Sequence, residues 1–130
     1  DVLTPGSQQA EKSGFNRTRL GYLLLLLTGL RRHCRVVGDS MQPTIYDGDF
    51  VIYRPFNPKK NSIKEGCIVV VSHPLEPDNL MVKRVHKEST LGIELRGDNE
   101  LASIDSRQFG LVNQNCLLGV VEEIIKAKSK

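Results

Sequence analysis

Residues 79–96 read NLMVKRVHKESTLGIELR and contain two segments with strand character. The first segment, residues 79–86, is strand-like and rich in apolar residues. In the second, residues 92–96, apolar residues alternate with polar ones, the period of a half-buried strand. The polar KEST that separates them, followed by Leu91, predicts a hairpin loop. This stretch therefore predicts an antiparallel hairpin, the first piece of a β-rich fold.

Other short strand signals occur on both sides of this hairpin. They are RVVG (35–38), DFVIYR (49–54), CIVVV (67–71) and CLLGVVEEII (116–125). The last one fits a closing strand with a bulge at Gly119 or a helix, because a short apolar run does not distinguish the two. Short strands separated by Gly, Pro, Asn and Asp predict a mainly β fold, a small curled or partly closed barrel-like sheet after one short N-terminal helix.

The N-terminal part divides into a polar segment and an apolar one. Residues 1–16 are polar and predict a flexible tail, whereas residues 17–34 predict a short apolar helix with a basic flank. Residues 35–130 would form the remaining domain. The chain begins with Asp, and a longer native N-terminus would favour a membrane anchor.

The apolar run LGYLLLLLTGL, residues 20–30, is too short to span a bilayer. As a helix it would be about 16 Å long, against roughly 30 Å of hydrocarbon. One interpretation is a short helix that packs on the domain. The other is an interfacial anchor in which residues 20–35 contact lipid, with Arg31, Arg32 and Arg35 on anionic headgroups.

Composition excludes several classes of function. With 5% aromatic residues, no Trp and a net charge of +3, the chain has neither a base-stacking surface nor a basic stripe for nucleic acid. Cys34, Cys67 and Cys116 lack the spacing of a disulfide framework or a zinc site. We therefore expect free thiols, no metal or other cofactor, and a cytoplasmic location, peripheral at the membrane if residues 20–35 contact lipid.

The candidate chemistry begins with Ser40 in GDSMQPTIYDGDF, residues 38–50. The histidines show no pattern that would make one of them its base. A lysine can serve instead, provided that burial disfavours its charged form. Alternation on the first strand of the hairpin places Lys83 between Met81 and Val85 on one face. By pattern alone, such a lysine is more often an edge residue with an exposed amine.

Three motifs together resemble the type I signal peptidase family of Ser/Lys endopeptidases. They are VVGDSMQPTIYDGDFVIY (36–53), MVKRV (81–85) and RGDNELASIDSRQFG (96–110). They follow the order of that family's boxes and cover about residues 35–113. The resemblance implies a Ser/Lys peptidase domain over residues 35–130.

The resemblance also implies a role for individual residues. Ser40 would be the nucleophile and its backbone N–H an oxyanion donor, while Lys83 would be the general base. Ser103 would orient the Lys83 amine, and Met41 would line the substrate pocket. A loop holding Ser103 and the lysine would be built by Asp98, Asn99, Asp105 and Arg107. Some members carry a serine where this chain has Gly38, so the second oxyanion donor stays open.

The layout is most similar to the nickel-type superoxide dismutase maturation proteases. Only 13 residues, 84–96, separate Lys83 from the last motif, so the second β domain of many signal peptidases is absent. The flanking VVVSHPLEPDNLMVKRV (69–85) also resembles this branch. The implied function is removal of an N-terminal leader from a superoxide dismutase precursor, whose own new N-terminus would bind the nickel.

Two other functions remain as alternatives. A signal peptidase acting on secretory precursors at the membrane shares the same motifs. A self-cleaving Ser/Lys regulator would need a DNA-binding module and an Ala-Gly cleavage site before Ser40, and residues 1–39 contain no Ala-Gly.

The orienting role of Ser103 leads to a first prediction. Ser103→Ala should reduce turnover without abolishing it, because the hydroxyl positions the base and does not react. Steady-state cleavage kinetics measure the effect, and a wild-type rate would contradict the role.

Overall fold

The computed structural model describes residues 17–102 and 106–127, and within them the fold is a six-stranded antiparallel sheet. The strands are β1 (Arg32–Arg35), β2 (Phe50–Pro55), β3 (Ile68–Ser72), β4 (Leu80–Ser89), β5 (Gly92–Arg96) and β6 (Leu117–Ile125). The helices are α1 (Arg17–Thr28), η2 (Glu100–Ala102), α2 (Ser106–Phe109) and η3 (Gln114–Cys116). The expected tail, residues 1–16, lies outside the described residues.

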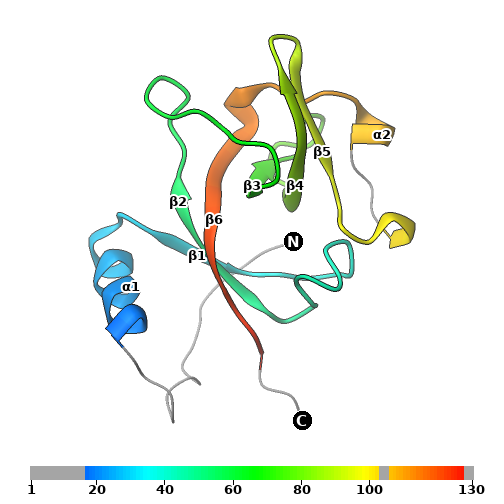
Figure 1. The fold of residues 1–130 in the computed structure, drawn as a ribbon. Helices are drawn as coiled ribbons and strands as arrows, with labels where there is room; N and C mark the ends of the chain where they lie inside the picture. Colours follow the sequence, from blue (N-terminus) through cyan, green and yellow to red (C-terminus); the bar gives the residue numbers. More distant parts are fainter. Residues whose placement is uncertain (1–16, 103–105, 128–130) are drawn as a thin grey trace.

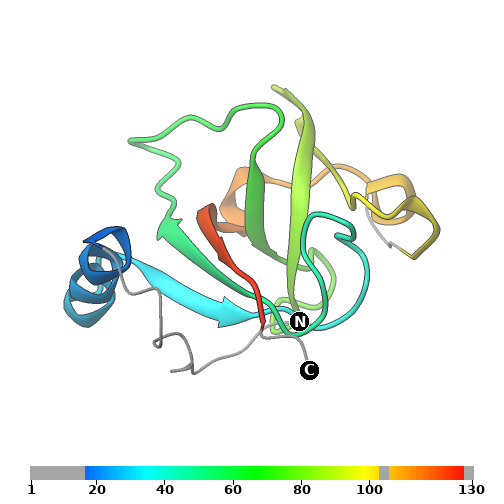
Figure 2. The same ribbon diagram turned by 60° about the horizontal axis from the view of Figure 1, so that its bottom comes forward.

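The strand order is β1-β2-β6-β3-β4-β5, so the last strand of the chain lies in the middle of the sheet (Figure 1). The sheet curls, with β1 and β5 as its two edges, and it does not close into a barrel (Figure 2). This confirms the expected mainly β fold with one short N-terminal helix. Because β6 pairs with both β2 and β3, the local ambiguity between helix and strand is resolved in favour of strand.

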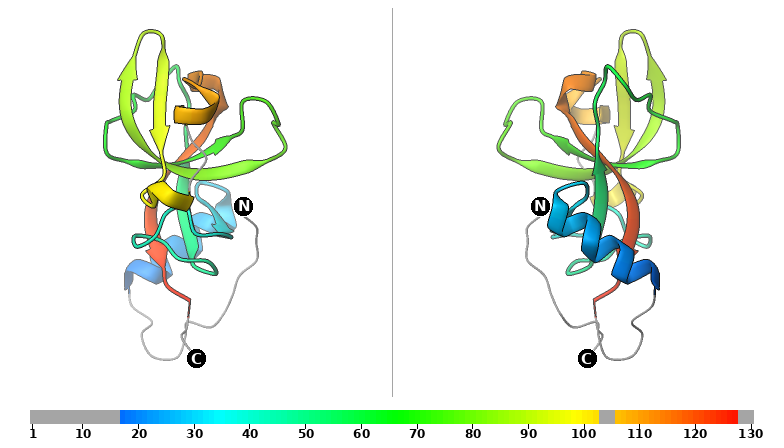
Figure 3. Two further views of the ribbon diagram at one scale, coloured as in Figure 1. Left: turned by 90° about the vertical axis from the view of Figure 1, so that its right-hand side faces the viewer. Right: turned by 90° about the vertical axis from the view of Figure 1, so that its left-hand side faces the viewer.

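The β4–β5 hairpin has a tighter turn than the sequence predicts. β4 continues to Ser89, which pairs with Gly92, so Thr90 and Leu91 alone form the connection. The polar residues after the apolar part of β4 are exposed, and they extend the ladder beyond the core (Figure 3). Strand pairing therefore continues where hydrophobic alternation has stopped.

The first strand begins earlier than expected. The sequence predicted a strand at residues 35–38, but β1 covers the basic segment Arg32–Arg35. The reason is the pairing of Cys34 with Val51, which places the buried Cys34 in the core. After Val36 the chain turns away, and Val36 exchanges hydrogen bonds with the residues around Gly48.

Helix α1 ends before the basic segment. Gly29 has a φ of 84°, and the N–H of Leu30 bonds to the carbonyl of Leu25 over 3.0 Å, a glycine-terminated helix end. In the part of the chain that the structure describes, no helix is both long and apolar enough to cross a membrane.

Gly119 illustrates how closely β6 packs in the middle of the sheet. A Cβ at this position would lie 2.7 Å from the carbonyl oxygen of Arg54 and would overlap the ring of Tyr53. The β3–β6 register also shifts next to it, between Val70 and Val71, close to the bulge that the sequence predicted. A side chain here would force β2 and β6 apart.

We therefore predict that Gly119→Ala lowers the free energy of unfolding by about 1–3 kcal/mol, the usual cost of overpacking. Urea unfolding measures this change. Gly21→Ala is the matched control, because no atom lies within 4 Å of its added Cβ. Equal stability of the two variants would contradict the close packing.

Candidate functional site

The turn that carries Ser40 is held by its own backbone and by Asp47. The carboxylate of Asp47 accepts a 2.8 Å hydrogen bond from the N–H of Gly38. The N–H groups of Thr44 and Ile45 both donate to the Met41 carbonyl over 2.9 Å. These bonds close a compact turn, and Ser40 within it is half-buried.

Met41 anchors this turn in the core. Its side chain is 1% exposed and belongs to a cluster with Val36, Ile45 and Val82. Val82 lies on β4, so the residue after Ser40 belongs to the same core cluster as the lysine-bearing strand, on the face of that strand opposite to Lys83. A substrate contact through the Met41 side chain would require it to move out of the core, and its role in substrate binding stays a prediction.

Asp49 connects the same turn to the end of β6. One carboxylate oxygen accepts the N–H of Tyr46 over 2.9 Å, and the other accepts the N–H of Ala127 over 2.8 Å. The Lys126 amine donates to Asp49 and, over 2.7 Å, to the Thr44 carbonyl. Burial alone would raise the pKa of Asp49, but these hydrogen bonds outweigh it and lower the pKa.

Asp98 joins the serine turn to β4. One of its oxygens accepts a 2.6 Å bond from the Thr44 hydroxyl, and both accept bonds of 2.8–2.9 Å from the Arg84 guanidinium. The hydrogen bond from Arg84 is the main cause that lowers the pKa of Asp98. Burial opposes it, and the Thr44 bond adds to it. We call Thr44, Arg84 and Asp98 the clamp.

Asn99 adds a second connection beside the clamp. Its backbone N–H donates to the Ser40 carbonyl over 2.8 Å, and its side-chain amide donates to the Asp39 carbonyl over 3.1 Å. The loop after β5 therefore contacts the backbone of the proposed nucleophile itself. The side chain of Asp39 meanwhile accepts a bond from Gln42 within the turn.

Lys83 is buried, with 4% of its surface exposed. It lies on β4 opposite Val69 of β3, and strand alternation puts it on the face of Met81 and Val85. Arg84, the next residue, points to the opposite face and belongs to the clamp. Burial disfavours the charged ammonium form of a lysine, which is the condition that a lysine base needs.

The last motif is attached to β5. Ser106 accepts a 2.9 Å hydrogen bond from the N–H of Leu95 at its hydroxyl oxygen. Arg107 of α2 forms an exposed ion pair with Glu100 at 3.6 Å, which contributes little stability. Ser103 and Asp105 lie outside the described residues.

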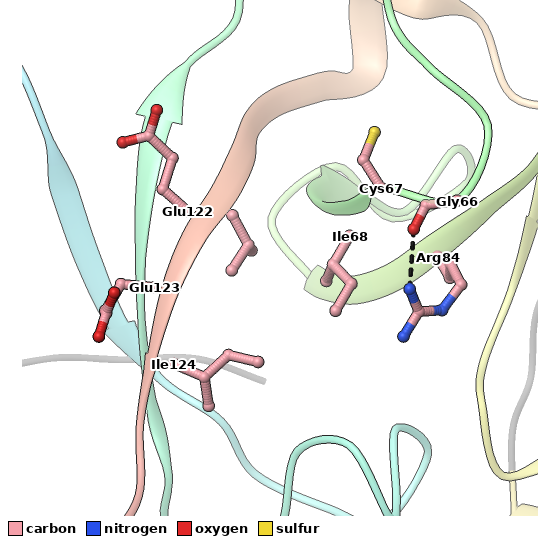
Figure 4. A pocket seen from close by; sticks show the side chains of 8 residues that line it. Gly66, Cys67, Ile68, Arg84, Glu122, Glu123 and Ile124 are labelled. Carbon is pink, nitrogen blue, oxygen red and sulfur yellow. Dashed lines mark hydrogen bonds between the residues drawn. The ribbon is translucent and has the colours of Figure 1, made fainter.

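A pocket of about 320 Å³ lies where β3 and β6 diverge (Figure 4). On one side the Arg84 guanidinium donates to the Gly66 carbonyl over 2.7 Å, and on the other lies β6. Its lining residues are Gly66, Cys67, Ile68, Arg84, Val121, Glu122, Glu123 and Ile124. Arg84 thus belongs to both the pocket and the clamp.

The described residues give less support to a cysteine nucleophile or to a metal site. Burial raises the pKa of the Cys34 thiol to about 12, so it stays protonated as a core side chain. All three cysteines are free. Within residues 17–102 and 106–127, no group of His, Cys, Asp and Glu has the arrangement of a metal site.

The structure brings the Ser40 turn together with Asp98 and Asn99. Lys83 lies on the face of β4 opposite to the clamp residue Arg84. Thr44 and Arg84 stand inside the quoted motifs, but no sequence pattern marks either of them as part of the site. Their shared partner Asp98 is 54 residues from Thr44 and 14 residues from Arg84, and nothing in the local sequence indicates such a pairing. Only the fold brings them to one carboxylate.

The curled β sheet carries both a half-buried serine in a turn and a buried lysine in a strand, the two residue types that a Ser/Lys hydrolase uses. The Peptidase S24-like family model matches residues 28–117, well over half of the chain. The chain therefore belongs to the Peptidase S24-like family and is a serine-type peptidase by that membership. No curated protein has a sequence that matches it significantly.

The clamp leads to a prediction about stability and pH. Asp98→Asn should lower the free energy of unfolding at neutral pH by about 1–3 kcal/mol, because it weakens partly buried charged hydrogen bonds. The pKa of Asp98 is lower in the folded protein than in the unfolded chain. The Asp98 carboxylate therefore stabilises the fold fully above its unfolded-state pKa, and this stabilisation is lost as the pH falls through its folded-state pKa.

The difference in the free energy of unfolding between the wild type and Asp98→Asn should therefore shrink below about pH 4. Urea unfolding at a series of pH values measures it. Asp78→Asn, in an exposed loop, is the control. A difference that does not depend on pH would contradict the role of the Asp98 charge.

Proposed function

We propose that this protein is a Ser/Lys endopeptidase that removes an N-terminal leader from a precursor protein. The observation that carries the proposal is the burial of Lys83 in β4, within a chain of the Peptidase S24-like family. A buried lysine needs a reason, because burying an ammonium group is costly. General-base catalysis for Ser40 supplies that reason.

In the proposed reaction, the Ser40 hydroxyl attacks the scissile carbonyl carbon while the neutral Lys83 amine accepts its proton. The tetrahedral intermediate carries a negative charge on the former carbonyl oxygen, and the Ser40 N–H would stabilise it. When the C–N bond breaks, the Lys83 ammonium returns the proton to the leaving amine. Water then hydrolyses the acyl-enzyme with Lys83 again as base.

The clamp supports this proposal because it restricts the turn that carries the nucleophile. Asp98 holds the turn through Thr44 and holds β4 through Arg84, which is adjacent to Lys83 in the chain. Asn99 adds a bond to the Ser40 carbonyl. A catalytic pair loses rate steeply when its groups are misplaced by about 1 Å, so such restraint favours catalysis.

For the substrate, we propose a nickel-type superoxide dismutase precursor. The support is the short interval between Lys83 and the last motif, together with the flanking residues 69–85, which resemble that maturation branch. The nickel would belong to the substrate after its leader is removed. A secretory precursor is the rival substrate, on the same three motifs.

The test is cleavage of purified precursors. The wild-type protein should shorten the superoxide dismutase precursor at one site, detected by mass spectrometry, and leave a secretory precursor intact. Ser40→Ala and Lys83→Met should each reduce the rate at least about a thousandfold, as loss of a catalytic group does. Ser62→Ala and Lys87→Met are the controls, because both residues are exposed.

Each other outcome has a distinct meaning. Cleavage of the secretory precursor alone would replace the substrate, and shortening of the chain itself alone would favour the self-cleaving regulator. Undiminished turnover in folded Lys83→Met would remove the Ser/Lys mechanism. In the wild type, the rate should rise with pH as the Lys83 ammonium loses its proton, and a flat profile between about pH 6 and 9 would contradict a lysine base.

A further inference from the structure

Asn99 contacts the peptide groups on both sides of Ser40. It lies between β5 and η2, in a loop that runs beside the serine turn (Figure 1). Its backbone N–H donates to the Ser40 carbonyl over 2.8 Å, and its side-chain amide donates to the Asp39 carbonyl over 3.1 Å. The first bond holds the peptide group after the nucleophile, and the second holds the peptide group before it.

The peptide group before Ser40 contains the proposed oxyanion donor. The Asp39 carbonyl and the Ser40 N–H belong to one planar trans unit, in which the C=O and N–H bonds point in opposite directions. The direction of the carbonyl therefore fixes the direction of the N–H. Within the described part of the chain, the Ser40 N–H donates to no acceptor, which leaves it available to a substrate oxygen.

Two hydrogen-bond donors hold the Asp39 carbonyl. The N–H of Gln42 reaches it over 3.2 Å from within the turn, whereas the Asn99 amide comes from a distant part of the chain. A carbonyl oxygen has two lone pairs, so both bonds form at once. Together they restrain the peptide plane. Because hydrogen bonds in series polarise one another, they also strengthen the N–H at the other end of the peptide as a donor.

We propose that Asn99 is a positioning residue of the oxyanion site, whose side-chain amide orients the Asp39–Ser40 peptide so that the Ser40 N–H points at the oxygen of the tetrahedral intermediate. This role rests on the proposed function, because it presupposes Ser40 as the nucleophile. It goes beyond building the loop around Ser103. A misdirected donor stabilises the transition state less and changes substrate binding little, so the contribution of Asn99 belongs to kcat.

Cleavage kinetics of the precursor test this role. Asn99→Ala removes the amide and keeps the backbone bond to Ser40, so it should lower kcat at least about tenfold and leave KM within about twofold. Asn99→Asp should be no better, because a carboxylate does not donate to a carbonyl. Asn115→Ala, at an exposed position in η3, is the matched control and should keep the wild-type kcat.

A binding measurement separates positioning from a general loss of structure. Ser40→Ala and Ser40→Ala/Asn99→Ala should bind the precursor with the same dissociation constant, because the oxyanion forms only after attack. Asn99→Ala should also unfold in urea close to the wild-type midpoint, since its half-buried side chain loses one hydrogen bond.

The outcomes distinguish this role from the proposed function. Wild-type kcat in Asn99→Ala, together with loss of cleavage in Ser40→Ala, would overturn the positioning role and leave the proposed function in place. Undiminished cleavage by Ser40→Ala would remove the proposed function and this role with it. Weaker precursor binding by Ser40→Ala/Asn99→Ala than by Ser40→Ala would assign Asn99 to substrate binding or to the fold, against a role at the oxyanion site.

Discussion

The carboxylate of Asp98 is the contact on which the site geometry depends. It receives the Thr44 hydroxyl from the serine turn and the Arg84 guanidinium from β4, so one side chain joins two parts of the chain. An aspartate with such partners stays charged and accepts strong hydrogen bonds, which the lowered pKa of Asp98 reflects. Without the Asp98 carboxylate, the serine turn would be held by the packing of Met41, by the hydrogen bonds of Asn99 and by contacts with the end of the chain.

Those contacts with the end of the chain lie on the far side of the turn. Lys126 and Ala127 hydrogen-bond to Asp49 and to the Thr44 carbonyl, just after β6. Because β6 lies between β2 and β3, its last residues emerge beside the turn. The serine turn is thus restrained from two directions, by the loop after β5 and by the residues after β6.

Asp49 and Lys83 are both buried residues with ionisable side chains, but they lie in different parts of the core. Asp49 is surrounded by hydrogen-bond donors that stabilise its negative charge. Lys83 lies on the face of β4 that it shares with Met81 and Val85, where the strand packs in an apolar cluster. The hydrogen bonds around Asp49 retain its charge for structure. The proposed reaction requires Lys83 as the neutral amine, the form that burial favours for a lysine in general.

The sequence by itself determined most strands and the identity of the candidate catalytic residues. Alternation and apolar runs mark β2 to β5, because side-chain burial on a strand is a local pattern, and the three motifs point to Ser40 and Lys83. It did not place β1, since a basic segment became a strand only through Cys34 and its pairing with Val51. Tertiary structure alone decided the position of β6 and the clamp, because both depend on residues far apart in the chain that meet only once the sheet has formed.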